Sequence, residues 1–477
     1  MSSNQLLALM PIIVSSAAAL VVMVLTAIHR NHVLIFTVTA VLLAAALASV
    51  VVAIPVIPRD VTSLIVVDRY GLFYIGLILA ATLVLVFLSY GYLKRQSQRR
   101  EEYYILLILA AVGSEVLACA SNYVSFFLGL EILSISLYGL VAYERDTLNG
   151  IEAGLKYLIL AGVSSAFILF GLALIYAEQG SLQFASILAT RGSSFGILSL
   201  VGFGLVTVGV GFKLAVVPFH LWTPDVYQGA PAPATAFVAT VSKGAIIAFL
   251  LRYFIQLNLY QYPSVMITFS LIAGASILVG NILGLLQNNV KRILAYSSIA
   301  HLGYFLVALL AGGTAAVSSV TFYLVAYFIT NLGAFGVVAY LSESGEQEAE
   351  MIEDYRGLAW RHPWIAGVFT AMLLSLASIP LTAGFIGKVF IMTAAAGARL
   401  WALLIVLVIG SVISIFYYFR ILIAMFRREE GVVAPTYPSF SLLGGIALSV
   451  LTILLVWFGV YPTTIVNVIG GLTSGLL

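Results

Sequence analysis

Charged side chains are scarce in this sequence. Asp, Glu, Lys and Arg together make up 9% of the 477 residues, whereas 62% of the residues are hydrophobic. A soluble globular domain has about 25% charged residues. A chain this apolar cannot cover a surface that faces water, so we expect its solvent to be the hydrocarbon of a bilayer. The composition excludes a soluble enzyme or binding domain and predicts an all-α polytopic membrane protein.

Cysteine is nearly absent as well. The single Cys119 lies in an apolar run and can form no internal disulfide. No Cys-x-x-Cys pair or histidine cluster predicts a metal ion or an iron–sulfur centre, and no Gly-rich phosphate loop follows a strand. The net charge is +3, with no basic tract suited to nucleic acid. We therefore expect this chain to bind no metal, cofactor or nucleic acid, and any redox cofactor to belong to partner chains.

Long apolar runs dominate what is present. A membrane-spanning helix needs about 20 apolar residues. The run from Leu6 to Ile28 is too long for the apolar part of a cleaved signal peptide, so it is interpreted as the first span. The runs between polar breaks predict about fourteen helices, near residues 5–28, 33–56, 70–91, 103–120, 122–142, 153–177, 195–229, 232–256, 264–286, 292–311, 316–341, 363–394, 399–426 and 439–460. The seventh and twelfth are too long for one straight span, and each has a central proline, Pro218 and Pro380.

Lysine and arginine are divided unevenly between the two ends of these helices. Most of them lie in the loops that follow odd-numbered helices: Arg30, Lys94, Arg95, Arg99, Arg100, Arg145, Lys291, Arg292, Arg356, Arg361, Arg427 and Arg428. The loops at the opposite end hold only Arg59, Arg69, Arg191 and Arg399. Cytoplasmic loops carry the excess of Lys and Arg, so both termini are predicted to be periplasmic, in a Gram-negative inner membrane. The acidic stretch from Glu343 to Asp354 then lies in a cytoplasmic loop, and we interpret it as a solvated linker without chemistry.

Weak internal similarity predicts a repeat. Asn122 and Asn288 begin similar segments 166 residues apart, and Tyr138 matches Tyr304 at the same offset. The unit would be helices 4–8 followed by helices 9–13. Five is odd, so the second copy would be inverted, as in many transporters. We divide the single transmembrane domain (1–477) into three N-terminal helices (1–100), two repeats (101–260 and 261–428) and a C-terminal helix with its tail (429–477). Alternatively, the two central prolines are simple kinks.

Ionisable groups inside predicted spans are the strongest functional signal, because such groups are costly in hydrocarbon and usually mark an ion or proton path. They are Glu131, Lys156 with Glu152 one turn earlier, Lys213, His220, Lys243, His301 and Lys388. A lysine that snorkels lies near a helix end, whereas Lys213 and Lys243 lie well inside theirs. Arg252 and Arg420 lie near helix ends and are expected to snorkel or to pin the interface. Glu115 either pairs with a neighbouring helix or faces a cytoplasmic funnel, and we assign it no role.

Buried lysine suits proton transfer. A low-dielectric environment disfavours the charged amine, and a nearby carboxylate favours it, so a lysine between these conditions can exchange a proton near neutral pH. Glu131 and Lys156 lie on consecutive antiparallel helices, and we expect them to form an ion pair. Movement of Glu131 away from Lys156 would then drive the proton off Lys213. His220 and His301 could bridge gaps in the path, or each could be a satisfied core histidine.

Three segments carry a family resemblance. Gly211-Phe-Lys-Leu-Ala-Val-Val-Pro-Phe-His-Leu-Trp-Thr-Pro-Asp-Val-Tyr-Gln-Gly-Ala-Pro resembles the helix 7–8 signature of the subunit N family of bacterial NADH-quinone oxidoreductases, or respiratory complex I. Lys291-Arg-Ile-Leu-Ala-Tyr-Ser-Ser-Ile-Ala-His-Leu-Gly-Tyr resembles its helix 10, and Ile379-Pro-Leu-Thr-Ala-Gly-Phe-Ile-Gly-Lys its helix 12. The resemblance spans the whole chain, and the sister subunit M pattern favours Glu where this chain has Lys388.

The resemblance implies a fold of fourteen helices, two inverted five-helix repeats, and broken helices 7 and 12. It implies a proton-pumping subunit of a translocase, in which Glu131, Lys156, Lys213, Lys243 and Lys388 carry protons and His220 and His301 support the path. NADH, FMN, iron–sulfur clusters and quinone would be bound by partner subunits. The implied partners are subunit M, the small subunits near the quinone site, the lateral helix of subunit L, the peripheral redox arm and membrane lipids. Glu115 departs from the family pattern, in which a small residue is commoner.

Two other functions remain open from the residues. A sodium/proton antiporter subunit would share the lysines and broken helices, but the continuation Trp222-Thr-Pro-Asp-Val-Tyr-Gln and Lys388 favour subunit N. A scaffold that transports nothing could use the same charges to fix helix packing. It predicts that neutralising Glu131 or Lys213 affects assembly and leaves the coupled rate of the assembled complex unchanged.

Overall fold

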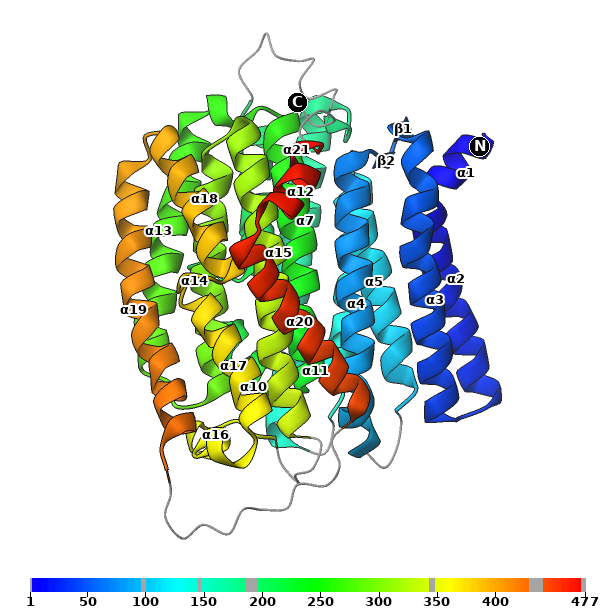
Figure 1. Cartoon of the computed structure of the whole chain (residues 1–477). Coiled ribbons are helices and arrows are strands. Elements are labelled where there is room, and N and C mark those ends of the chain that lie inside the picture. The colour runs from blue at the N-terminus through cyan, green and yellow to red at the C-terminus, as the bar shows by residue number, and fades with distance from the viewer. Residues whose placement is uncertain are drawn as a thin grey trace.

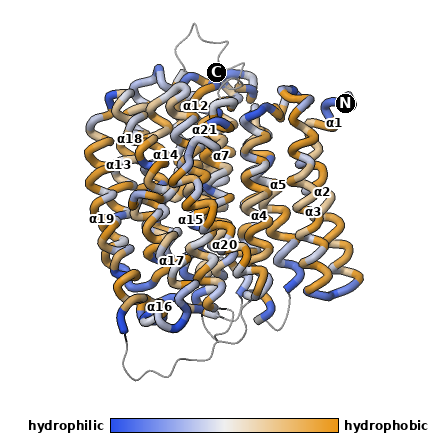
Figure 2. Tube along the Cα trace, in the orientation of Figure 1, coloured by the Kyte–Doolittle hydropathy of each residue, from blue (hydrophilic) through white to orange (hydrophobic). Residues whose placement is uncertain are grey.

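The apolar runs form helices that lie side by side and cross the molecule from one end to the other (Figure 1). In lipid, the helix satisfies every backbone polar group within one segment, which is why each run folds this way. The computed structural model describes residues 2–95, 100–144, 147–184, 196–342, 348–428 and 441–472. Figure 2 shows hydrophobic residues along the lengths of the helices and hydrophilic residues gathered at their two ends.

The N-terminal part has three long helices. They are preceded by a short helix and interrupted by a 3-10 turn and a two-stranded antiparallel ribbon in which Arg59 pairs with Val67. The elements are α1 (Ser3–Ala8), α2 (Met10–Ile28), α3 (His32–Ala53), η1 (Ile54–Val56), β1 (Arg59–Asp60), β2 (Val66–Val67) and α4 (Arg69–Arg95).

The middle of the chain holds the two groups of helices expected to form repeats. The first group is α5 (Glu102–Ala118), α6 (Tyr123–Val141), α7 (Leu148–Gln179), α9 (Ile197–Leu214), α10 (Trp222–Gly229), α11 (Ala232–Phe237), the π turn η2 (Val238–Ser242) and α12 (Lys243–Gln256). The second is η3 (Leu259–Gln261), α13 (Pro263–Leu285), α14 (Val290–Leu310), α15 (Gly313–Leu341), η4 (Ile352–Tyr355), α16 (Leu358–Arg361), α17 (Pro363–Leu376), α18 (Ala383–Gly397) and α19 (Trp401–Phe426). The chain continues with α20 (Leu442–Val460) and α21 (Thr463–Gly470).

The polytopic all-α fold is confirmed. Twelve of the described helical stretches are long and apolar enough to cross a membrane. The helix α5 has 17 residues, and α17 and α18 are two shorter apolar helices in succession. A count of about fourteen would need α5 as one crossing and α17–α18 as another, and it stays a prediction. The predicted spans match these helices to within a few residues.

The two ends of the bundle differ in charge. The helices α1 and α21 lie at one end, which we call the termini face, and α16 lies at the other, which we call the basic face (Figure 1). The loops around Arg30, Arg100, Arg292, Arg361 and Arg427 lie on the basic face because their helices end there. Arg99, Arg145 and Arg191, which were also used to predict orientation, lie outside the described residues, as do residues 343–347 of the acidic stretch.

Matching local structures favour the inverted repeat. Asn122 caps α6 with its side chain and forms an isolated β-bridge with Gln183, which follows α7. Asn289 caps α14 in the same way and forms a β-bridge with Met351, which follows α15. The first bridge lies on the termini face and the second on the basic face, as an inverted copy requires. The repeat and its boundaries stay predictions.

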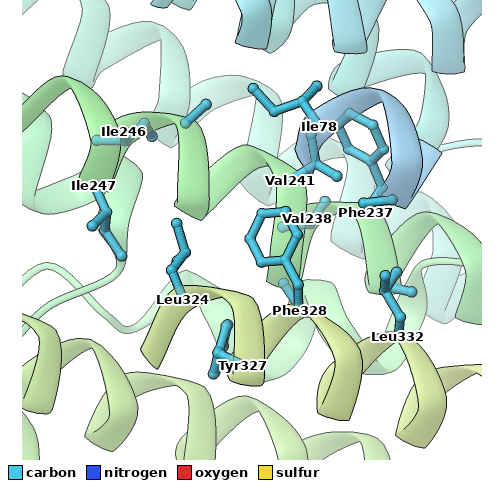
Figure 3. Close-up of a cluster of buried hydrophobic side chains, with 14 of the residues drawn as sticks. Ile78, Phe237, Val238, Val241, Ile246, Ile247, Leu324, Tyr327, Phe328 and Leu332 are labelled. Carbon is cyan, nitrogen blue, oxygen red and sulfur yellow. The ribbon is translucent and has the colours of Figure 1, made fainter. Parts of the chain in front are cut away.

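The core lies where α11, η2 and α12 pack against α15. Figure 3 shows Val238 beside the Phe328 ring of α15, while the Phe237 ring lies on the other side of the helix, near Ile78 of α4. Gly244 permits the close approach, because a Cβ at that position would lie 2.4 Å from the Phe328 ring. Both stretches are buried along their length by the surrounding helices, so the segment that carries Lys243 is held on every side.

Candidate functional site

Four buried basic groups lie on four different helices. They are Lys213 in α9, Lys243 in α12, His301 in α14 and Lys388 in α18. Their exposed fractions are 6%, 1%, 4% and 1%. None of the three lysines has an ion pair among the described residues. Lys213 is hydrogen-bonded to a hydroxyl and feels the charge of Glu131, whereas Lys243 and Lys388 lie near aromatic rings. Such groups in the middle of a membrane protein usually mark an ion or proton path.

Lys213 is held by α6. Its Nζ donates to Ser134 Oγ at 2.7 Å, and Ser134 lies one turn after Glu131 on the same helix. The Glu131 carboxylate accepts from Ser165 Oγ of α7 at 2.5 Å and acts electrostatically on Lys213. Lys213 also lies in the last turn of α9, where the partial negative charge of the helix C-terminus favours an ammonium group.

The first helix break follows Lys213 directly. Ala215 adopts the left-handed conformation at φ 63°, and Val216 N donates to Gly211 O at 3.1 Å to close the end of α9. The indole Nε1 of Trp222 donates to Phe212 O at 3.0 Å, so a side chain from the far side of the break satisfies a carbonyl freed by it. Pro218 lies within this segment of residues 215–221.

The second break repeats this geometry. Ser378 has φ 59°, and Ile379 N donates to Leu374 O at 2.9 Å, which ends α17 in the same way that α9 ends. Gly384 N of α18 donates to Ser375 Oγ of α17 at 3.1 Å across the break. Pro380 lies inside this segment, as Pro218 does in the first. Positive φ values at non-glycine residues are strained and concentrate at functional sites.

Lys243 follows the π turn η2, a kind of irregularity that is frequent at functional sites. Its Nζ donates to Ser298 Oγ at 2.8 Å, and Ser298 is hydrogen-bonded to the Tyr327 hydroxyl at 2.7 Å. The amine also lies 5.0 Å from the centre of the Tyr227 ring and 6.0 Å from that of Trp222. Aromatic faces stabilise a cation without binding it permanently to a carboxylate.

His301 lies one turn beyond Ser298 on α14. Its Nδ1 is hydrogen-bonded to the Tyr323 hydroxyl at 2.7 Å, and its ring stacks on the same tyrosine. The Tyr418 hydroxyl of α19 lies 3.5 Å from Nε2. Both ring nitrogens therefore face hydroxyl groups that can donate or accept a proton.

Lys388 lies beyond His301, on the first helix after the second break. Its Nζ lies 4.5 Å from the centre of the Tyr304 ring and has no hydrogen-bond partner in the part of the chain that the structure describes. His220 is buried in the first break. Its Nδ1 likewise has no hydrogen-bond partner among the described residues. Buried polar atoms of this kind need water, or a hydrogen-bond partner that moves into place, to satisfy them.

The expected ion pair between Glu131 and Lys156 is not formed. Lys156 Nζ contacts Glu152 at 2.5 Å and Asp225 at 2.6 Å. Side chains on helices lean towards the helix N-terminus. Because α6 and α7 are antiparallel, Glu131 leans towards the termini face and Lys156 towards the basic face. The prediction considered only which helices are neighbours and neglected this lean.

Glu115 contacts a neighbouring helix, which is one of the two alternatives left open by the sequence: it is buried and accepts from Ser15 of α2 at 2.8 Å. Two other interpretations need correction. Arg252 does not snorkel: it forms a fully buried bidentate pair with Asp68 at 2.7 and 2.8 Å. The acidic stretch is not wholly a solvated linker, because Glu348 is buried and paired with Lys291. Arg420 does pin a helix end, donating to Leu285 O at 2.7 Å.

Sequence reasoning missed the polar partners of the basic groups. Asp225 lies in the quoted helix 7–8 signature but was given no role. Ser134, Ser298 and the tyrosines around His301 were not identified, since serine and tyrosine are common in apolar helices and carry no charge signal. No group of three or more His, Cys, Asp or Glu residues that could hold a metal occurs in the described ranges.

The chain is similar to known proteins over nearly all its length. Residues 120–414 match the family described as NADH:quinone oxidoreductase/Mrp antiporter, TM. NADH-quinone oxidoreductase subunit N of Ectopseudomonas mendocina (strain ymp) is 46% identical, covering 98% of this chain and 96% of the relative. Subunit N of Nitrosospira multiformis is 49% identical, covering 87% and 86%. A chain of respiratory complex I from Thermus thermophilus with bound aureothin superposes with a TM-score of 0.82 at 32% identity, covering 96% and 99%.

Proposed function

This chain belongs to the NADH:quinone oxidoreductase/Mrp antiporter family, within the subunit N group, and from that premise we propose that it translocates protons as a membrane subunit of an NADH-quinone oxidoreductase. The observation that carries the proposal is the succession of buried basic groups from Lys213 to Lys388, none of which forms an ion pair among the described residues. Groups that are not bound directly to a carboxylate can change their protonation state.

The succession divides into short steps. From Lys243, hydrogen bonds lead through Ser298 to Tyr327. One turn further along α14, His301 is bonded to Tyr323 and faces Tyr418. Lys388 then lies over Tyr304, a ring that also contacts His301. Hydroxyl and imidazole groups both accept and donate, so each can pass a proton without carrying a lasting charge.

Lys213 is the group that would be loaded and emptied. The Glu131 carboxylate favours its charged form, and arrival of another cation at Glu131 would cancel that effect. The proton would then leave through the first break towards Lys243; in this break the buried Nδ1 of His220, which has no partner among the described residues, can bind water. Release would occur from Lys388 through the second break to the termini face.

Other chains would perform the redox chemistry. NADH oxidation at FMN, electron transfer through iron–sulfur clusters and quinone reduction are assigned to partner subunits, among them the peripheral arm and the small subunits near the quinone site. Subunit M and the lateral helix of subunit L would contact this chain in the membrane. With the basic face in the cytoplasm, protons would move towards the periplasm of a bacterial inner membrane.

The decisive experiment replaces Lys213 in the assembled complex. In membrane vesicles, Lys213→Ala should lower NADH-driven proton pumping by about tenfold or more, because the step has lost its titratable group. Reduction of a soluble artificial acceptor by NADH should be unchanged. Lys213→Arg keeps a cation that cannot lose its proton and should also fail to pump, even where the complex assembles normally.

The control is Lys94→Ala, which removes an exposed lysine at the basic end of α4 and should leave pumping intact. Full pumping by both Lys213 variants would refute the proposal. A scaffold role predicts that only assembly suffers, and that Lys213→Arg pumps normally once assembled. An antiporter subunit would purify without flavin and iron–sulfur partners.

A further inference from the structure

Asp225 occupies a position between two basic groups from the two halves of the molecule. Its Oδ2 accepts from Lys156 Nζ of α7 at 2.6 Å, and its Oδ1 accepts from Arg292 Nη1 of α14 at 2.7 Å. Arg292 is also held by Gln228 and Gln287, each at 3.1 Å. Lys156 has one further carboxylate, Glu152, one turn earlier on its own helix. Arg292 is therefore fixed in place, whereas Lys156 is held by carboxylates alone.

Glu131 of α6 is the second carboxylate that Lys156 could reach by a change of side-chain conformation. The Tyr138 ring of α6 contacts the Tyr157 ring of α7 at 5.8 Å, which places Lys156 level with Tyr138. Glu131 lies seven residues before Tyr138, or about 10 Å along the helix. A lysine and a glutamate side chain that turned towards each other would together cover about that distance. Lys156 and Glu152 are partly exposed, so the lysine is not packed in place.

We propose that Asp225 is a positioning residue that holds Lys156 away from Glu131 and thereby controls whether the Glu131 charge acts on Lys213. The proposal rests on the proton-translocating function above. With Lys156 on Asp225, as in this structure, the Glu131 carboxylate is left to stabilise charged Lys213. With Lys156 on Glu131, that carboxylate is neutralised, and Lys213 releases its proton; this order is the reverse of the one expected from the sequence, in which separation of Glu131 from Lys156 drove the release.

Arg292 makes this exchange possible. A buried or half-buried carboxylate left without any cation is costly, so Lys156 could not leave Asp225 easily if it were the only partner. Because Arg292 remains, Asp225 stays compensated when Lys156 moves. The charged groups that face Asp225 are Lys156, Glu152 and Arg292; the charged group that acts on Lys213 is Glu131.

The experiment compares two substitutions that should act in opposite directions. Asp225→Asn removes the acceptor and sends Lys156 to Glu131, so pumping should fail at a lower pH than in the unmodified complex. Arg292→Gln leaves Asp225 with Lys156 as its only cation and strengthens that hold, so the alkaline limit of pumping should move to higher pH. We expect each shift to be about half a pH unit or more, measured as protons pumped per NADH in vesicles that contain the whole complex.

Several controls distinguish positioning from folding. Asp225→Glu should restore the unmodified pH profile, and Asp60→Asn, an exposed carboxylate on the termini face, should change nothing. If Asp225→Asn lowers the amount of complex, Glu152→Gln gives the same test at an exposed residue: it should shift the limit in the direction of Asp225→Asn.

Shifts of Asp225→Asn and Arg292→Gln in the same direction, or an unchanged pH limit in Asp225→Asn and Glu152→Gln, would overturn the inference. That failure is separable from failure of the proposed function. If only this inference fails, Lys213→Ala still abolishes pumping. If the proposed function fails, Lys213→Ala leaves pumping intact.

Discussion

Glu348 is a buried carboxylate that joins four parts of the chain on the basic face. It forms an ion pair with Lys291 at the start of α14, accepts from Tyr92 of α4 at 2.5 Å, and accepts from Ala232 N of α11 at 2.9 Å. Burial alone would raise the pKa of Glu348, but the charge and hydrogen bond of Lys291, with the other donors, outweigh burial and lower it. The carboxylate is thus charged in the folded protein and fixes the ends of these helices.

Replacing Glu348 by Gln should destabilise the protein by about 3–5 kcal/mol at neutral pH, because Lys291 is left buried without its partner. The folded-state pKa lies below the unfolded value, so the stabilisation is present above the unfolded pKa and is lost as pH falls through the folded pKa. Thermal unfolding of the purified complex should therefore differ most at pH 7, and the difference should narrow below about pH 4. Glu353→Gln, an exposed carboxylate in the same loop, should have no such effect, and an equal effect would contradict the assignment.

At the residue scale, the sequence predicts which basic groups are buried but not what they touch. Lys213, Lys243 and Lys388 can be found because each interrupts an apolar run. Their partners come from other helices far along the chain, so no local pattern reveals them. Ser298 contacts Lys243 from 55 residues away. The wrong Glu131–Lys156 pair shows that knowing the neighbouring helices is insufficient without the direction in which side chains lean.

At the scale of elements, the two broken helices share one construction. In each, the first half ends with a left-handed residue and a hydrogen bond from the next residue back to the last turn, at Val216 and at Ile379. A side chain then joins the two halves: the Trp222 indole in the first break and the Ser375 hydroxyl in the second. The breaks are therefore ordered structures, and each is adjacent to a buried lysine.

Trp222→Phe should loosen the first break. It leaves the buried Phe212 carbonyl without its donor, which costs about 1–3 kcal/mol, and it replaces the indole ring near Lys243 by a smaller aromatic ring. Amide hydrogens of residues 211–216 should exchange faster by about fivefold or more, and pumping should fall. Trp360→Phe is the matched control: its indole also donates to a carbonyl, that of Phe426 at 3.0 Å, but Trp360 is exposed. If the amide hydrogens of residues 211–216 exchange at the same rate in both variants, the Trp222 indole does not stabilise the break.

The elements themselves could largely be predicted, for a physical reason. In lipid, an apolar run of sufficient length has no stable alternative to the helix, and proline removes a helix hydrogen bond, so both the spans and the places of interruption can be located. The π turn before Lys243 could not, because residues Val238–Ser242 have an ordinary helical composition. Each break also has a polar contact from another helix: Val217 N donates to Ser276 Oγ of α13, and Ser375 Oγ is hydrogen-bonded to Thr330 Oγ1 of α15. These contacts could not be predicted from the sequence either.

At the scale of the whole molecule, the distribution of charge and the arrangement of the helices agree. The loops rich in arginine lie on the face opposite α1 and α21 (Figure 1). The β-bridges at Asn122 and Asn289 lie on opposite faces, as two copies of inverted orientation would place them. The buried basic groups from Lys213 to Lys388 extend from the first predicted repeat to the second, with Lys243 and His301 at their contact.

The charge on the basic face predicts the orientation of the bundle, because Lys and Arg are enriched in cytoplasmic loops. Alkaline phosphatase fused after Leu472, at the end of the described chain, should be active, since that enzyme matures only in the periplasm. The same enzyme fused after Arg428, at the end of α19, should be inactive, and a fluorescent protein in its place should be bright. These two fusion points are separated by one further span, α20, so they must report opposite sides. The reverse pattern would place the basic face outside and would also reverse the direction of proton release from Lys388.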